Sequence, residues 1–178
     1  VGSEMCIRDS CCGRPASHPP GPLHRLQQNA GMDAYLLIGN ANTRKTSLIR
    51  SLTGCFNRSV RDIQLQSGRP VRFYARVGAL QNTRTTLDEF VQEVNRSRCD
   101  AVIFSLLPTA VQTDLMDYPD AQTYVAGLRE RGWRFKAVAV LGQDGGGVRA
   151  PNLRQYIQAG TAPVNVTARD VRAQFGWL

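Results

Sequence analysis

A uniformly apolar run, followed by a polar loop and a periodic apolar segment, most constrains how this chain can fold. Residues 34–38 are all apolar, which is typical of a central strand in a parallel sheet. Five polar or small residues follow Gly39, and from Lys45 onward apolar side chains recur at Leu48, Ile49 and Leu52. That spacing is the spacing of one helical face. The segment therefore predicts a buried strand, a tight loop and a helix in direct succession.

The loop fits the phosphate-loop (Walker A) pattern G-x-x-x-x-G-K-[ST], with one departure. Such a loop directs backbone N–H groups and a helix N-terminus at a chain of phosphates. Lys45 would neutralise the outer phosphates, and the Thr46 hydroxyl would bind Mg²⁺. The predicted ligand is a nucleoside triphosphate, either ATP or GTP. The predicted binding residues of this segment are Gly39, Asn40, Ala41, Asn42, Thr43, Arg44, Lys45, Thr46 and Ser47.

The departure is Arg44, which stands where the pattern has its last glycine. Glycine at that point adopts positive φ readily and lets the backbone approach phosphate closely. Two interpretations stay open. The Arg44 guanidinium makes a compensating bidentate phosphate contact, or the loop is degenerate and binds weakly. The lysine supports the motif, because Lys45 and Lys136 are the only lysines among 22 basic residues.

The first 31 residues are expected to stand outside the folded domain. Residues 1–10 resemble a translated sequencing-adapter peptide of the kind found in metagenomic reading frames, and residues 11–31 have no periodicity and no apolar signal-peptide core. We therefore expect a non-native or disordered extension over residues 1–31 and a single nucleotide-binding domain over residues 32–178.

Composition excludes several classes of function from that domain. Both histidines, His18 and His24, precede residue 32, so catalysis by Ser-His-Asp or Cys-His and zinc sites that need imidazole are excluded. Cys55 and Cys99 form no disulfide framework, and no apolar run reaches the ~20 residues of a membrane helix. A cytoplasmic location without membrane contact is the expectation. The formal net charge of +8 favours polyanionic partners, although the arginines are scattered.

Alternating strand and helix patterns predict an α/β fold with helices on both faces of the sheet, a three-layer α/β/α sandwich. Strands are predicted over 63–66, 71–77, 101–107, 135–141 and 164–166, in addition to 34–38. Helices are predicted over 86–94, 119–128, 151–159 and from 167 to the C-terminus, in addition to 45–52. Thr86 with Glu89, and Thr167 with Asp170, have the spacing of capping boxes.

This order of elements resembles the small Ras-like GTPases. The phosphate loop, followed by Ser51-Leu52-Thr53-Gly54, looks like the first loop and helix of translation-factor-type and ribosome-assembly GTPases. The resemblance implies a P-loop NTPase fold with a mostly parallel sheet and an antiparallel edge strand at Ile63. It also implies a nucleotide at the carboxyl ends of the central strands.

The resemblance also implies roles for residues beyond the loop. Asp144 is the one residue that fits the family's base-contacting Asn-Lys-x-Asp, and 164–168 is similar to its last base-contacting loop. Gln81 and Asn82 are candidates for orienting a catalytic water, and Ser59 for a mobile-loop contact with Mg²⁺. The family's Asp-x-x-Gly has no counterpart, because Arg76 and no aspartate stands in that region.

Three functions follow from the sequence. The first is an NTP-binding protein that hydrolyses its ligand slowly as a switch. The second is a small-molecule phosphotransferase, for which Arg129, Arg131 and Arg134 would supply an arginine-rich lid. The third is a catalytically degenerate phosphate-loop module whose basic surface binds nucleic acid or a protein partner.

Overall fold

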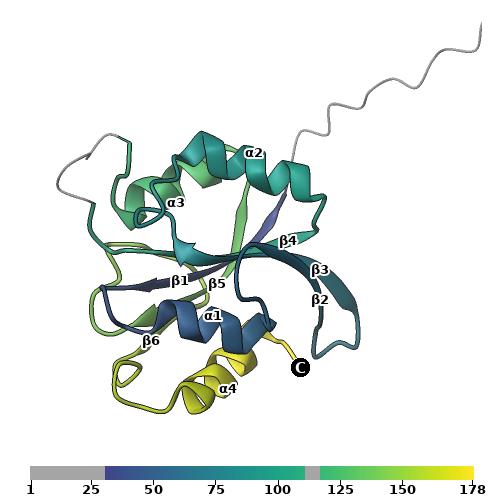
Figure 1. The fold of residues 1–178 in the computed structure, drawn as a ribbon, viewed down its shortest axis with the longest axis vertical. Helices are drawn as coiled ribbons and strands as arrows, with labels where there is room; N and C mark the ends of the chain where they lie inside the picture. The colour runs from purple at the N-terminus through teal and green to yellow at the C-terminus, as the bar shows by residue number, and fades with distance from the viewer. Residues whose placement is uncertain (1–30, 111–116) are drawn as a thin grey trace, which may run out of the picture.

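The computed structural model describes residues 31–110 and 117–178. They form a six-stranded, mostly parallel sheet with helices on both faces (Figure 1), which bears out the predicted α/β class. The expected extension over residues 1–31 lies outside the described residues, apart from Gly31. The elements in chain order are β1 (Asp33–Gly39), α1 (Lys45–Thr53), β2 (Ser59–Gln64), β3 (Pro70–Ala79), α2 (Leu87–Ser97), β4 (Ala101–Leu106), α3 (Ala121–Glu130), β5 (Arg134–Leu141), β6 (Leu153–Tyr156) and α4 (Val164–Phe175).

The strand order is β2-β3-β4-β1-β5-β6. β1 pairs in parallel with β4 on one side and β5 on the other, so it is central, as its apolar sequence predicts. β2 pairs antiparallel with β3 at one edge, as expected for the hairpin. The second hairpin strand, β3, pairs with β4 and therefore lies one strand away from β1.

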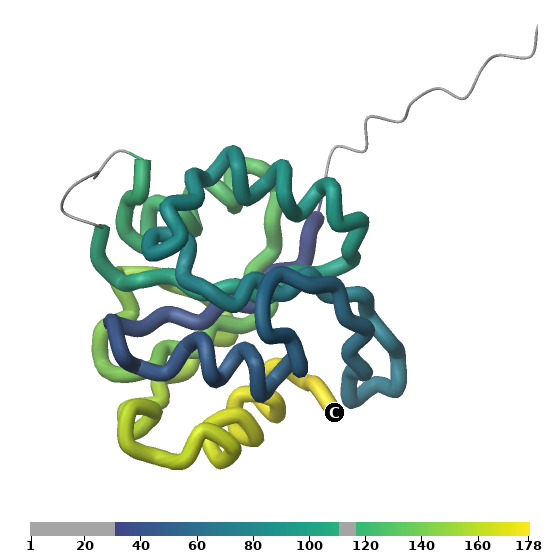
Figure 2. The backbone as a smooth tube through the Cα atoms, viewed as in Figure 1, coloured from purple at the N-terminus to yellow at the C-terminus, as the bar shows by residue number. Residues whose placement is uncertain are grey.

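Two apolar cores lie on opposite faces of the sheet. α1 and α4 pack side by side over one face, where Leu48 and Val171 join a cluster of buried strand residues (Figure 2). α2 and α3 cover the other face, where Phe90 and Tyr124 pack over β1, β4 and β5. Alternate residues of β1 contribute to the two cores, because successive strand side chains point to opposite faces.

The chain leaves the adjacent strands β1 and β4 toward opposite faces. The connection from β1 leads to α1, and the connection from β4 leads to α3 on the other face (Figure 1). Ligands of open α/β sheets bind outside the carboxyl ends of the strands where neighbouring connections diverge in this way. The topology therefore places the start of α1 at the carboxyl end of the central strands, where a ligand is expected.

Two local predictions are wrong. The expected helix over 151–159 is instead the short strand β6 between two turns, because 153–156 completes the sheet by pairing with Val138–Leu141. Backbone hydrogen bonds with the edge of β5 stabilise this strand more than a weak helical pattern stabilises a helix. Ile157, the large apolar residue of this segment, is 63% exposed.

The expected strand over 164–166 is the first turn of α4. Val164 and Ala168 lie one helical turn apart and pack toward α1 with Val171 and Phe175, so a helical face decides the conformation. The capping box predicted for Thr167 and Asp170 is consequently wrong, since Thr167 lies within the helix and Pro163 precedes its first residue. The capping box of Thr86 and Glu89 at α2 is confirmed.

Candidate functional site

The loop between β1 and α1 is closed by short bonds within itself. The Thr43 hydroxyl donates to the Asn40 carbonyl at 2.8 Å, and the Thr43 N–H also faces this oxygen. Gly39 is needed for this packing, since a Cβ there would lie 2.5 Å from Thr43 Oγ1 and 3.0 Å from the Leu141 carbonyl oxygen. The glycine at 39 therefore permits a close approach between the strand end and the loop.

Lys45 folds back over the loop and is 7% exposed. Its Nζ donates to the carbonyl oxygens of Gly39 and Asn40, each at 2.6 Å, and to Thr43 Oγ1 at 3.4 Å. Burial lowers the pKa of Lys45 to about 8, because desolvation disfavours the charged form. Two backbone acceptors thus fix the ammonium group at the loop, and its third and longest bond is the easiest to exchange for another acceptor.

Arg44 takes the conformation that the pattern reserves for glycine. Its φ is 60° and its ψ is 23°, in the left-handed region, and Asn42 has a φ of 63°. Left-handed backbone is strained for an arginine. Its guanidinium lies away from the loop and donates to the Ala162 carbonyl oxygen at 3.1 Å. The loop therefore has left-handed backbone at positions 42 and 44 without a glycine at either.

The positive N-terminus of α1 is not neutralised by a cap or an acidic residue of the helix. Leu48 makes the first i−4 bond, to the Arg44 carbonyl oxygen at 2.9 Å, so the preceding N–H groups have no acceptor within the helix. No side chain caps the helix, and its first turn contains no acidic residue. The positive end of the helix dipole, these N–H groups and Lys45 together favour an anion.

A hollow of about 420 Å³ opens beside this helix end. We call it the loop hollow; it is lined by residues 41–46 together with Ala79 and Asn82. The exposed Thr46 side chain contributes to its wall. The predicted residues Lys45, Thr46 and Asn82 therefore meet at one place, although Asn82 comes from the connection between β3 and α2.

Gln81, the other candidate for orienting water, is positioned differently. Its side chain is 2% exposed. The amide nitrogen donates to the carbonyl oxygens of Leu107 and Pro119 at 3.0 and 3.1 Å, and the amide oxygen accepts from the Leu107 N–H at 3.0 Å. These bonds join the end of β3 to the connection after β4, so the structure favours a bracing role for Gln81.

The remaining predicted residues are not brought to the loop hollow. Asp144 is exposed, and its carboxylate accepts from the Gly146 N–H at 2.9 Å, which closes a turn after β5. Ser59 begins β2 and does not line the loop hollow. Ser47 is exposed in the first turn of α1. Residues 164–168 form the start of α4, so the base-contacting loop expected there is wrong.

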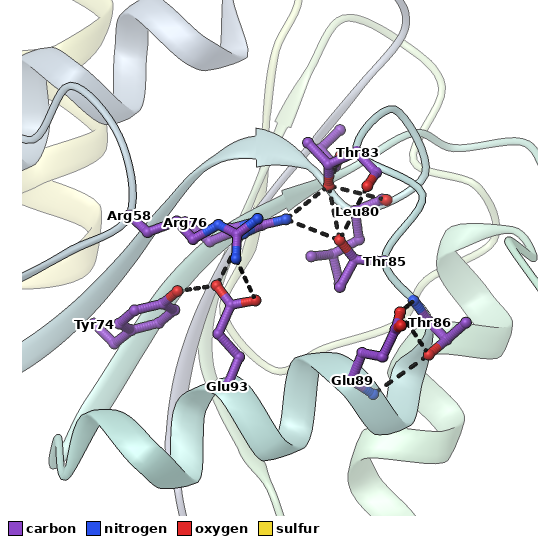
Figure 3. A network of polar contacts seen from close by, with 10 residues as sticks. Arg58, Tyr74, Arg76, Leu80, Thr83, Thr85, Thr86, Glu89 and Glu93 are labelled. Atoms are coloured by element: carbon purple, nitrogen blue, oxygen red, sulfur yellow. Dashed lines mark hydrogen bonds and ion pairs between the residues drawn. The ribbon is translucent and has the colours of Figure 1, made fainter.

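A second polar cluster, not anticipated from the sequence, surrounds Arg76 (Figure 3). The Arg76 guanidinium is buried and donates to Glu93 at 2.9 Å, to Thr83 Oγ1 at 3.0 Å and to Thr85 Oγ1 at 2.8 Å. Glu93 also accepts from the Tyr74 hydroxyl. Burial and the carboxylate of Glu93 raise the pKa of Tyr74. An arginine within the otherwise uncharged run 73–79 of a predicted strand was the one available signal, because such a charge is buried only with partners.

No protein-family model, curated protein or solved structure matches this chain. The site therefore has to be interpreted from its own geometry. Within residues 31–110 and 117–178, no group of three His, Cys, Asp or Glu residues is arranged to hold a metal ion. Over the same ranges, no helix has the length and apolar character needed to cross a bilayer.

Proposed function

We propose that this protein binds a nucleoside triphosphate, ATP or GTP, with its phosphates in the loop hollow, as a P-loop protein. The observation that carries the proposal is the convergence of three groups on one hollow. Lys45 is fixed at the loop by backbone carbonyls, the α1 N-terminus has neither cap nor acid, and the left-handed residues Asn42 and Arg44 shape the path between them. Each of these features favours an anion.

The phosphates would lie along the backbone of residues 41–46, which line the hollow, and would accept hydrogen bonds from main-chain N–H groups at the start of α1. Lys45 would exchange its 3.4 Å bond to Thr43 for a phosphate oxygen while keeping both carbonyl contacts. Thr46 is exposed at the wall of the hollow, so its hydroxyl would hold the Mg²⁺ that accompanies the nucleotide. The ion neutralises phosphate charge when it is bound.

The hollow itself contributes little beyond binding. No carboxylate lines it among the described residues, and phosphoryl transfer depends on positioned charge and an oriented nucleophile. Asn82, which lines the hollow from the connection between β3 and α2, would orient a water. The proposal is therefore a slow NTPase of the switch type, with binding as its primary property.

The test is the melting temperature of the full chain with and without Mg·ATP or Mg·GTP. At a hundredfold excess over Kd, binding adds about 2.7 kcal/mol to the free energy of unfolding, a shift of several degrees in Tm. Lys45→Ala should abolish this shift.

Lys136→Ala is the matched control, since Lys136 is the other lysine of the chain and pairs with Asp33 at 3.9 Å on the surface. It should keep the full shift. Equal shifts in the wild type and Lys45→Ala, or no shift with either nucleotide, would overturn the proposal.

A further inference from the structure

A second hollow, of about 340 Å³, adjoins the first and shares Thr46 with it. We call it the arginine hollow. Its wall brings together the first two turns of α1, the segment before β2, the end of β3 and the connection that follows β3. The residues that matter for its chemistry are Thr46, Arg50, Phe56, Arg58, Arg76 and Thr83.

Positive charge is in excess in this hollow. Three guanidiniums, from Arg50, Arg58 and Arg76, contribute to its lining. Glu93 is the carboxylate that balances them, and it is shared by Arg76 at 2.9 Å and Arg58 at 3.5 Å (Figure 3). Glu93 itself lies outside the lining of the hollow, so one shared negative charge is set against three positive charges, and the surplus favours an anionic ligand.

One donor of Arg76 has no partner in the described part of the chain. The residue is 2% exposed. Its two terminal nitrogens are bonded to Glu93, Thr83 and Thr85, whereas its Nε has no hydrogen-bond partner among the described residues. A buried donor without an acceptor is costly. An oxygen of an anion bound against Arg76 would accept a hydrogen bond from this Nε.

The rim of the hollow carries an exposed aromatic ring. Phe56 is 73% exposed. Arg50 contacts both the main chain and the ring of this residue. The Arg50 Nε donates to the Phe56 carbonyl oxygen at 3.3 Å, and its guanidinium carbon lies 5.8 Å from the ring centroid. An exposed, held ring beside guanidiniums is suited to a flat ligand group that stacks on it.

We propose that the arginine hollow binds a small phosphorylated molecule with a flat ring, of the mononucleotide class. Its phosphate would contact Arg58 and Arg76, and its ring would lie against Phe56. The volume is at the lower end of the range for small-molecule pockets, which favours one small ligand over an extended polymer. The inference goes beyond the proposed function and does not depend on it, because the two hollows have different cations.

The test is calorimetric binding of AMP, ribose 5-phosphate and inorganic phosphate to the full chain. Arg58→Ala should weaken AMP binding about tenfold, the loss of one charge-assisted contact. Arg58→Lys should weaken it less. Phe56→Ala should weaken AMP binding about fivefold or more and leave ribose 5-phosphate binding unchanged.

Arg61→Ala is the matched control, because Arg61 is exposed on β2 and does not line the arginine hollow. It should bind AMP as the wild type does. Equal weakening in Arg61→Ala and Arg58→Ala would overturn the proposal, as would a single-stranded oligonucleotide that binds through Arg58 while AMP does not bind at millimolar concentration.

Lys45→Ala separates this inference from the proposed function. AMP binding that survives Lys45→Ala and falls in Arg58→Ala supports the arginine hollow, even if Mg·ATP produces no shift in Tm. AMP binding that falls in Lys45→Ala and survives Arg58→Ala places AMP in the loop hollow and overturns the inference.

Discussion

The loop after β1 and the end of β3 each place a buried cation near the carboxyl edge of the sheet, but they hold it by different means. The loop holds Lys45 through backbone carbonyl oxygens, and β3 holds Arg76 through the side chains of Glu93, Thr83 and Thr85. The backbone acceptors are close to Lys45 in sequence, so the loop by itself fixes the ammonium group. Side-chain acceptors engage both terminal nitrogens of Arg76 inside the protein. The comparison shows two ways of holding a buried cation at the same end of the sheet, one by the neighbouring main chain and one by side chains of α2 and of the connection before it.

The largest effect is expected from breaking the Arg76 cluster. Glu93→Ala removes the carboxylate and leaves Arg76 buried without a counter-charge, which should lower the free energy of unfolding by about 3 kcal/mol. Chemical denaturation measures this loss. Asp88→Ala is the control on the same helix, because Asp88 is 76% exposed and pairs with Arg131 at the surface. It should cost less than about 1 kcal/mol, and equal losses in the two variants would show that the Arg76 cluster is not stabilising.

A smaller effect is expected from the protonation of Lys45. Burial lowers its pKa to about 8, below the ordinary value of about 10.4. Between these values the unfolded chain holds more protons than the folded one, so the free energy of unfolding should rise with pH. From pH 8 to 9.5 the rise should exceed that of Lys45→Met by about 1 kcal/mol. Urea denaturation across this range gives the comparison.

The same group links protons to the ligand. Phosphates next to Lys45 would raise its pKa, so Mg·ATP binding at pH 8.5 should take up protons in the wild type. Lys45→Met, which should not bind the nucleotide, serves only for the comparison of stability. Calorimetry in two buffers of different ionisation enthalpy detects the uptake. Identical pH profiles of stability for the two proteins would show that Lys45 does not titrate in this range.

The smallest effect is expected at Arg44. Its guanidinium donates to the Ala162 carbonyl oxygen, far along the chain from the loop, so we expect Arg44→Gly to keep Mg·ATP affinity within about threefold. Stability should change by less than about 1 kcal/mol, because relief of left-handed strain offsets the greater freedom of glycine in the unfolded chain. Titration of Mg·ATP measures the affinity. A tenfold loss would favour the alternative in which Arg44 compensates for the missing glycine by binding phosphate.

Much of the site was predictable because it is contiguous in sequence. The run from Gly39 to Thr46 is bounded by a strand and a helix whose apolar patterns are unambiguous, and the structure has both elements at the predicted place. The sequence pattern predicts Gln81 and Asn82 equally as water-orienting residues, and only Asn82 lines the loop hollow. The separation depends on Leu107 and Pro119, whose carbonyl oxygens bind Gln81 from distant parts of the chain.

The predictions failed where local pattern competed with long-range pairing. Residues 151–159 and 164–166 are short, and each carries a pattern that suits either a helix or a strand. Residues 153–156 form a strand because they pair with the edge of β5. Residues 164–166 are helical because α4 packs its apolar face against α1. The arginine hollow was missed for a related reason, since its cations come from α1, the segment before β2 and β3.

By itself, the sequence determined the α/β alternation, the central strand and the loop–helix junction, because each depends on the conformation and periodicity of neighbouring residues. Only the tertiary structure decided the strand order, the direction of the Arg44 and Gln81 side chains and the meeting of three arginines beside Thr46. Those features arise from contacts between segments far apart in the chain, whose energies no local pattern encodes.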